Sequence, residues 1–289
     1  IGTLQNKGVE LSIQWRDKIG EFDYGISSNL TTINNIVNYI PSPLTSAYNK
    51  TITGQSIGCL YGYVSEGVIQ LSDEFYNRNQ SGEFVYDATK KIYTGYKFAN
   101  QESNNIPQPG DLKYRDLNGD GQVTTLDKTI IGKTIPGLTY TLNLNCSYKA
   151  FDFSIFFLGV SDFQIYNQQR ASLSSMNYQD QMHNKLVDYA LNHWTIENQS
   201  TTHVRVDPAN INNNDQISTF WIEDGSYLRV KDIQVGYSLP EKTAKLIGIS
   251  SLRVYGSASN IYNFTKYKGR DPESFMSSSP LNSGVDNGD

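Results

Sequence analysis

The feature of this sequence that most restricts its fold is a set of segments in which apolar and polar side chains alternate. In residues 8–16, Val9, Leu11, Ile13 and Trp15 alternate with polar or charged residues. A period of two places the apolar side chains on one face of a β-strand and the polar ones on the other. The pattern recurs at residues 22–32, 138–148, 151–157, 226–239 and 251–264. The sequence therefore predicts six strands. The alternation changes phase near Arg229 and Lys231, which indicates either a bulge or a strand that leaves the apolar zone there.

The connections between these strands alternate between short and long. Short turns are expected at residues 17–20, 149–150 and 240–250, whereas residues 34–137 and 167–225 form long links. In an antiparallel meander, this order places every short turn at one end of the sheet and every long loop at the other. Alternation alone fits a soluble sandwich as well as a membrane barrel. The asymmetry of the connections, with strands of about ten residues, favours an outer-membrane barrel.

The segment DLNGDGQVTTLD, residues 116–127, has the ligand spacing of a calcium loop. Such a loop needs side-chain oxygens at its first, third and fifth positions, glycine at the sixth, a backbone carbonyl at the seventh and a carboxylate at the twelfth. The residues that match the ligand positions are Asp116, Asn118, Asp120, Gln122 and Asp127. An Asx-rich turn is the alternative, but it does not require the final carboxylate. Pro107, Pro109 and Gly110 exclude a long entering helix, so we expect a single structural Ca²⁺ loop.

Composition and motifs exclude several functional classes. The net charge of −5, without basic runs, argues against a nucleic-acid partner. No Ser/His/Asp set, phosphate loop or CxxC pair is recognisable, and the spacing of the three histidines matches no zinc site. Asp73, Glu74 and Glu83 are interpreted as solvated loop acids, not as a glycosidase pair. We expect no enzymatic activity.

Five blocks of the chain resemble the C-terminal part of SusC/RagA-type TonB-dependent outer-membrane transporters. In order, they are NKGVELSIQW, IGCLYGYVSEGVIQ, PGDLKYRDLNGDGQVTTLDKTIIGKTIPGLTYTLNLNCSYKAFDFSIFFLGV, DGSYLRVKDIQVGYSLP and LRVYGSASNIYNFTKYKGRDPE. The resemblance implies an all-β fold, an antiparallel meander forming part of a transmembrane barrel of about 22 strands. Residues 1–289 would then be a C-terminal portion of that barrel, without its plug domain and final strand. Residues 34–137, with the calcium-type loop 116–127, and residues 167–225 would be long extracellular loops.

The same resemblance implies a function and partners. The expected function is active import of oligosaccharides or peptides across the outer membrane of a Gram-negative bacterium, energised by TonB through an N-terminal region outside this chain. The expected partners are a SusD-like surface lipoprotein that acts as a lid over the two long loops, and outer-membrane lipid. Two alternatives remain open at this stage: a passive porin-like or structural barrel, and a secreted calcium-stabilised β binding module.

The alternation also assigns faces to individual residues. We expect lipid contact for Val9, Leu11, Ile13, Leu142, Leu144, Phe153 and Ile155, and a polar lumen lined by Glu10, Gln14, Arg16, Asn29, Asn143 and Asn145. Trp15, Tyr140 and Tyr148 are interpreted as aromatic residues of the membrane interface. Residues 61–70 are expected to pack near the barrel mouth. Composition alone suggests sugar or peptide contacts for Tyr178, Asn192, Trp194, Asn210, Asn212 and Trp221.

Overall fold

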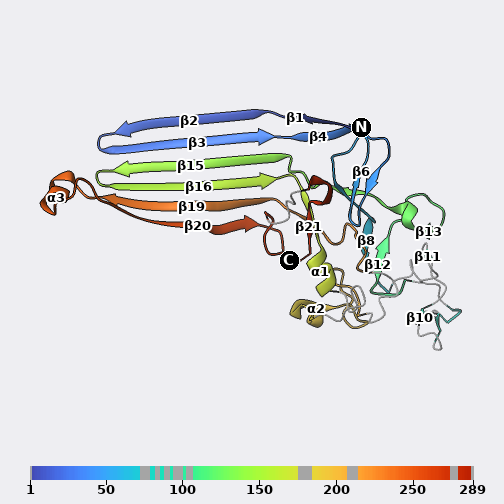
Figure 1. The fold of residues 1–289 in the computed structure, drawn as a ribbon. Coiled ribbons are helices and arrows are strands. Elements are labelled where there is room, and N and C mark those ends of the chain that lie inside the picture. Colours follow the sequence, from blue (N-terminus) through green and yellow to red (C-terminus); the bar gives the residue numbers. More distant parts are fainter. Residues whose placement is uncertain are drawn as a thin grey trace.

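The computed structural model describes residues 2–71, 79–81, 85–87, 92–93, 100–101, 107–174, 184–206, 214–273 and 279–287. Its main feature is one six-stranded antiparallel sheet in the order β2-β3-β15-β16-β19-β20 (Figure 1). The six strands are β2 (Glu10–Ile19), β3 (Phe22–Thr32), β15 (Leu138–Tyr148), β16 (Phe151–Ser161), β19 (Tyr227–Ser238) and β20 (Arg253–Thr265). Strands that neighbour one another in sequence also pair in space. All six predicted strands and their meander order are therefore confirmed.

The three short connections lie at one end of this sheet (Figure 1). The first turn is tighter than the predicted 17–20, because residues up to Ile19 remain paired, with Ile19 opposite Phe22. Gly20, with φ 63°, adopts the left-handed conformation that a two-residue hairpin loop requires. Lys149 has φ 54° at the equivalent position of the second turn. The third connection contains the short helix α3 (Glu241–Leu246).

Pairing places the alternating residues on two chemically different faces. Leu142 lies opposite Ser28 on one neighbouring strand and Phe157 on the other, and Leu144 lies opposite Ile26 and Ile155. The residues next along β15 form the other face, where Asn143 is opposite Ser27 and Asn145 is opposite Ser154. The polar face is not uniformly polar. Phe156 and Leu158 of β16 lie on it, because they are opposite Asn143 and Thr141 of β15.

The apolar face is largely uncovered. Ile13 is 59% exposed, Val235 51% and Val254 62%. A continuous apolar surface of this kind is unfavourable in water and marks a binding or membrane surface. Within the described residues, β2 and β20 each pair with a strand on one side only, which leaves backbone groups at both sheet edges available to further strands.

The predicted bulge is confirmed on β19. Val230 pairs with Phe157 and Asp232 with Phe156, so that Lys231 is the extra residue between them. A second register shift affects the pairing of β19 with β20 at the same place. A bulge of this kind increases the local twist of the strand and redirects its side chains.

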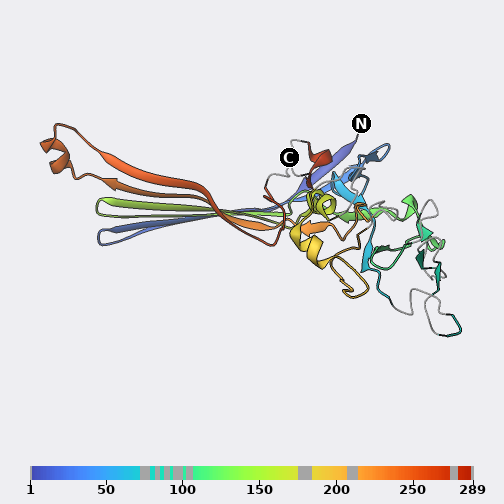
Figure 2. The same cartoon turned by 90° about the horizontal axis from the view of Figure 1, so that it is seen from below.

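Shorter elements form a folded lobe at the other end of the sheet, which we call the loop lobe: described residues of 34–137, 162–226 and 266–287 (Figures 1 and 2). Its strands are β4 (Asn34–Tyr39), β5 (Leu44–Thr45), β6 (Asn49–Thr51), β7 (Cys59–Gly62), β8 (Ser65–Val68), β9 (Tyr86–Asp87), β10 (Ile92–Tyr93), β11 (Asn100–Gln101), β12 (Leu112–Tyr114), β13 (Gln122–Val123), β14 (Thr129–Gly132), β17 (Gln164–Asn167), β18 (Ile222–Asp224) and β21 (Val285–Asp286). Its helical segments are η2 (Thr125–Asp127), α1 (Gln168–Leu173), α2 (Val187–Asn192) and η3 (Pro280–Asn282). β1 (Thr3–Lys7) pairs with β4 alongside the lobe. No helix in the described part of the chain has both the length and the apolar character needed to cross a membrane.

The hydrophobic core lies in the loop lobe, not in the sheet. Leu60, Leu112, Tyr166 and Trp221 form part of one buried cluster that joins segments of both long loops. A smaller cluster around Phe163, Ile165, Tyr227 and Tyr267 lies where the sheet meets the lobe. The lobe therefore has the buried apolar contacts that an independently ordered structure needs.

Candidate functional site

The calcium-type loop is held in shape by its own acidic and amide side chains. The Asp116 carboxylate accepts hydrogen bonds from the backbone N–H groups of Gly119 (2.6 Å) and Gly121 (2.9 Å). Asn118 Oδ1 accepts from Asp120 N–H, and Asp120 Oδ1 accepts from Gln122 N–H, each at 2.8 Å. These bonds turn the backbone sharply. Because a carboxylate or amide oxygen has more than one lone pair, each of the three side chains keeps acceptor capacity for a cation.

Asp127 is arranged differently from the other expected ligands. It is fully buried, and its carboxylate accepts hydrogen bonds from the N–H groups of Leu117 (2.8 Å), Asn118 (3.2 Å) and Thr124 (2.7 Å). Burial raises the pKa of this carboxyl, but these hydrogen bonds outweigh burial and leave the pKa below its ordinary value. Asp127 and Thr124 also form a capping box at η2.

The loop therefore fits a cation at its early positions better than at its last one. Asp116, Asn118 and Asp120 keep unused acceptor capacity, whereas the Asp127 carboxylate already accepts hydrogen bonds from three N–H groups. Among the described residues, no group of three or more His, Cys, Asp or Glu side chains has the geometry of a metal site. The calcium assignment remains a prediction.

A buried polar cluster joins the two long loops. Asp111 is fully buried, and its Oδ1 accepts from Arg205 Nε (2.6 Å) and Asn214 Nδ2 (2.9 Å), while Oδ2 accepts from Gln108 N–H (2.7 Å). Burial raises the pKa of Asp111, and the attraction and hydrogen bond of Arg205 act against that rise. Asn214 Oδ1 in turn accepts from Leu112 N–H (2.8 Å). We call these residues the Asp111 cluster.

Gly110, beside this cluster, is required by close packing. Its φ is +90°, and a Cβ atom there would lie 2.7 Å from the Trp194 ring and 2.6 Å from Arg205 Cβ. No motif in the sequence marked Asp111 or Arg205, because the two residues are 94 positions apart.

The structure corrects the expectation that Trp194 and Trp221 contact a sugar. Trp194 is 7% exposed and donates its indole N–H to Gln70 Oε1, and Trp221 is 1% exposed and donates to the Asn214 carbonyl. Both rings belong to the buried core of the lobe. A buried indole needs a hydrogen-bond acceptor for its N–H group, and Gln70 and the Asn214 carbonyl supply one each. Asn192 donates to Asp188. The packing expected for residues 61–70 is confirmed, since Tyr63, which lies between β7 and β8, and Val68 of β8 belong to the core.

Other expected residues lie outside the described part of the chain: Asp73, Glu74, Glu83, Tyr178, His183, Asn210 and Asn212. The aromatic residues expected at the membrane interface include Trp15 (59% exposed) and Tyr148 (49% exposed).

Basic residues at the β19 bulge are paired with the segment that follows β20. Arg229 forms ion pairs with Asp271 and with Glu273 (2.7 Å), and Lys231 pairs with Glu273 (2.9 Å). Arg229 is nearly buried, with 8% of its side chain exposed. The bulge thereby attaches residues 271–273 to the sheet.

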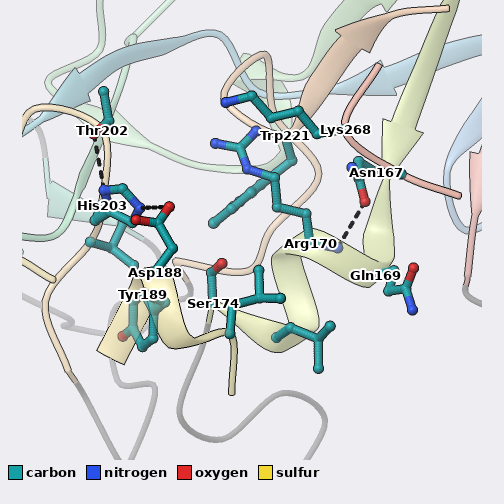
Figure 3. Close-up of a pocket in the computed structure, with 14 residues that line it drawn as sticks. Asn167, Gln169, Arg170, Ser174, Asp188, Tyr189, Thr202, His203, Trp221 and Lys268 are labelled. Atoms are coloured by element: carbon teal, nitrogen blue, oxygen red, sulfur yellow. Dashed lines mark hydrogen bonds and ion pairs between the residues drawn. The ribbon is translucent and has the colours of Figure 1, made fainter. Parts of the chain in front are cut away.

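A pocket of about 350 Å³ opens in the loop lobe beside α1 and α2 (Figure 3). Its wall includes apolar side chains from Leu173, Leu186, Tyr189, Val204 and Trp221. Its polar residues include Arg170, Lys268 and the hydrogen-bonded His203 and Asp188, whose Nε2 and Oδ2 are 3.0 Å apart. Sequence reasoning did not identify this pocket, because its wall is assembled from five separate segments of the chain.

Comparison with known proteins identifies the type of chain. It is 29% identical over 286 residues to TonB-dependent receptor P3 of Formosa agariphila, an alignment that covers 94% of this chain and 25% of the receptor. It is 26% identical over 277 residues to TonB-dependent receptor SusC of Bacteroides thetaiotaomicron, covering 94% of this chain and 24% of SusC. The chain is therefore similar in sequence to TonB-dependent receptors, SusC among them. No family model matches it.

The fold agrees with this similarity. A structure of the RagAB peptide transporter superposes with a TM-score of 0.70 and 20% identity, covering 99% of this chain and 27% of the other. At this identity the superposition shows the fold alone. The chain spans about a quarter of the length of the relatives it matches. Those relatives are named as receptors, not as enzymes.

Proposed function

We propose that this SusC/RagA-type chain supplies part of the barrel of an outer-membrane importer that is energised by TonB and takes up oligosaccharides or peptides. The observation that carries the proposal is the six-stranded sheet with one uncovered apolar face and one mainly polar face, in a chain related to TonB-dependent receptors. Lipid would cover the apolar face, and the polar face would line the lumen. Further strands would complete the barrel at β2 and β20.

The proposal includes an orientation in the membrane. The short turns would lie in the periplasm and the loop lobe outside the cell, as in other outer-membrane barrels. The lobe has its own core and would lie over part of the barrel mouth. A SusD-like lipoprotein would sit against this lobe as a lid, capture substrate outside and close it over the mouth. TonB would supply the energy for import.

Calcium has a structural role in this proposal. Asp116, Asn118 and Asp120 would supply side-chain oxygens and Gln122 a backbone carbonyl, with Asp127 completing the set or bracing the loop through its backbone hydrogen bonds. Extracellular calcium modules bind with dissociation constants of about 10⁻⁴–10⁻³ M. Asp116→Ala, or treatment with EDTA, should therefore increase protease cleavage within residues 34–137. Cleavage that is the same with and without EDTA in the wild-type protein would contradict the calcium site.

Uptake by cells tests the importer directly. Cells that express the full-length protein should accumulate a labelled oligosaccharide or peptide, and deletion of tonB should abolish that accumulation. A passive porin-like barrel would instead let the substrate enter equally in both strains.

Affinity purification from solubilised outer membranes tests the lid. The full-length protein should be recovered with a lipoprotein in stoichiometric amount. Recovery of the barrel alone, with uptake intact, would refute the lid.

A further inference from the structure

The pocket beside α1 and α2 has one side that carries positive charge. Figure 3 shows Arg170 and Lys268 together along that side, with the His203–Asp188 pair along another. Arg170 projects from α1, and Lys268 follows β20. These segments meet because Glu223 of β18 accepts from Arg170 Nη1 (3.1 Å) and from the Lys268 backbone N–H (2.8 Å).

Arg170 is fixed in position with part of its guanidinium unused. Nη1 donates to the Phe220 carbonyl and to Glu223, and the guanidinium lies 5.1 Å from the centroid of the Trp221 ring. Its Nε and Nη2 make no hydrogen bond with the described residues. Two adjacent N–H groups of a guanidinium match the two oxygens of a carboxylate. The side chain is thus pre-organised to receive one.

Lys268 adds a second positive charge to the same side. Its ammonium forms no hydrogen bond or ion pair with any residue that the structure describes, although its charge contributes to the lowered pKa of Asp188, after the hydrogen bonds from Asn192 and His203. His203 is less available, because Nε2 contacts Asp188 and Nδ1 contacts the Thr202 hydroxyl (3.0 Å). Arg170 and Lys268 are therefore the cationic groups that an entering anion would meet.

The uncharged residues of the pocket wall indicate the chemical character of the rest of the ligand. Leu173, Leu186 and Val204 contribute aliphatic surface, and Leu186 is 40% exposed. A sugar ring would need an open aromatic face, but Trp221 and Tyr189 are 1% and 2% exposed. The volume of about 350 Å³ lies at the lower end of the range for small-molecule pockets. The pocket thus suits one small group with an aliphatic side chain.

We propose that this pocket binds the carboxylate of a ligand with an aliphatic body, such as the C-terminal residue of a peptide, with Arg170 and Lys268 holding the carboxylate and Leu173, Leu186 and Val204 holding the side chain. The proposal rests on the importer function only in assigning the lobe to the cell exterior, where such ligands arrive. Binding to purified protein tests the pocket separately from transport.

The experiment measures calorimetric binding of N-acetylleucine to the full-length protein in detergent at low salt. N-acetylleucinamide, which has the same side chain without the charge, is the matched probe, and glucuronate offers a carboxylate on a sugar. N-acetylleucine should bind, and the other two should bind at least about tenfold more weakly, as loss of a charged hydrogen-bond partner or of the apolar contact predicts. Equal binding of the amide would refute the carboxylate assignment, and tighter binding of glucuronate would refute the aliphatic one.

Variants locate the site. Lys268→Gln should weaken N-acetylleucine binding by at least about fivefold, since it removes one of the two charges. The control is Lys266→Gln, an exposed lysine two residues away that does not line the pocket, and it should leave binding unchanged. The Lys268 side chain makes no hydrogen bond with the residues that the structure describes, and its backbone bond to Glu223 is kept in the variant, so the variant should fold like the wild type. Equal affinity in the two variants, or no binding of N-acetylleucine to the wild type, would overturn the proposal.

Discussion

Replacement of Asp111 by alanine should loosen the connection between the two long loops. Asp111 is the buried carboxylate to which Arg205, Asn214 and the Gln108 N–H all donate. Removing one partner of a buried ion pair costs about 3–5 kcal/mol, because the remaining charge is left without compensation. The Arg205 side chain is 24% exposed and can recover some hydration, which places the expected cost near the lower limit, about 3 kcal/mol.

This cost should appear as local opening of the loop lobe, while the sheet stays folded. A decrease of about 3 kcal/mol in the free energy of local opening raises the population of the open state roughly 100-fold. Hydrogen exchange of the full-length protein can detect it at the Ile69 and Arg205 amides, whose N–H groups donate to the Asp111 and Gly110 carbonyls. Limited proteolysis of the lobe should accelerate in parallel, provided that opening is fast relative to cleavage.

An exposed ion pair provides the control. Glu241 and Lys245 pair along α3 with 71% and 67% of their side chains exposed. Glu241→Ala should therefore change stability by less than about 0.5 kcal/mol. If Asp111→Ala changes exchange at Ile69 and Arg205 by less than about threefold, as a surface pair would, the Asp111 cluster does not join the loops and the reasoning is wrong.

Three further outcomes are expected. Leu142→Arg should reduce the yield of folded protein in lipid by a cost of about 2–4 kcal/mol if Leu142 lies near the bilayer midplane, whereas Asn143→Arg should be tolerated; equal yields would contradict the assigned faces. Because the pKa of Asp127 is lowered in the folded protein, its contribution to stability is present above its ordinary value of 3.8 and is lost as pH falls through the folded value. Pepsin should therefore cleave the 116–127 loop faster as pH falls below about 4, and Asp127→Asn should reduce that pH dependence. Burial raises the pKa of Cys59, which is 1% exposed, so a charged thiol reagent should modify it only after denaturation, and modification of the folded protein would contradict its burial.

Local patterning in the sequence determined the sheet. Alternation in residues such as Leu142 and Asn143 predicts a strand and its two faces without knowledge of its partners, because successive side chains of a strand point to opposite sides. The phase change at Lys231 predicted the bulge for the same reason. The difference between short and long connections then determined the meander and the end of the sheet at which the loops lie. The calcium-type spacing of residues 116–127 is equally local, and so is the turn that its Asx side chains form.

Only the tertiary structure decided how the long loops are organised. As aromatic residues on a long loop, Trp194 and Trp221 were expected to contact a sugar or peptide, but the fold buries them and supplies acceptors for their indole N–H groups. Arg170 and Lys268 are nearly a hundred positions apart in the sequence, and Glu223 brings their segments together. Strand alternation is a property of the chain over a few residues, so the sequence displays it directly. A buried ion pair or a pocket depends on contacts between distant segments, and no short pattern in the sequence encodes which segments meet.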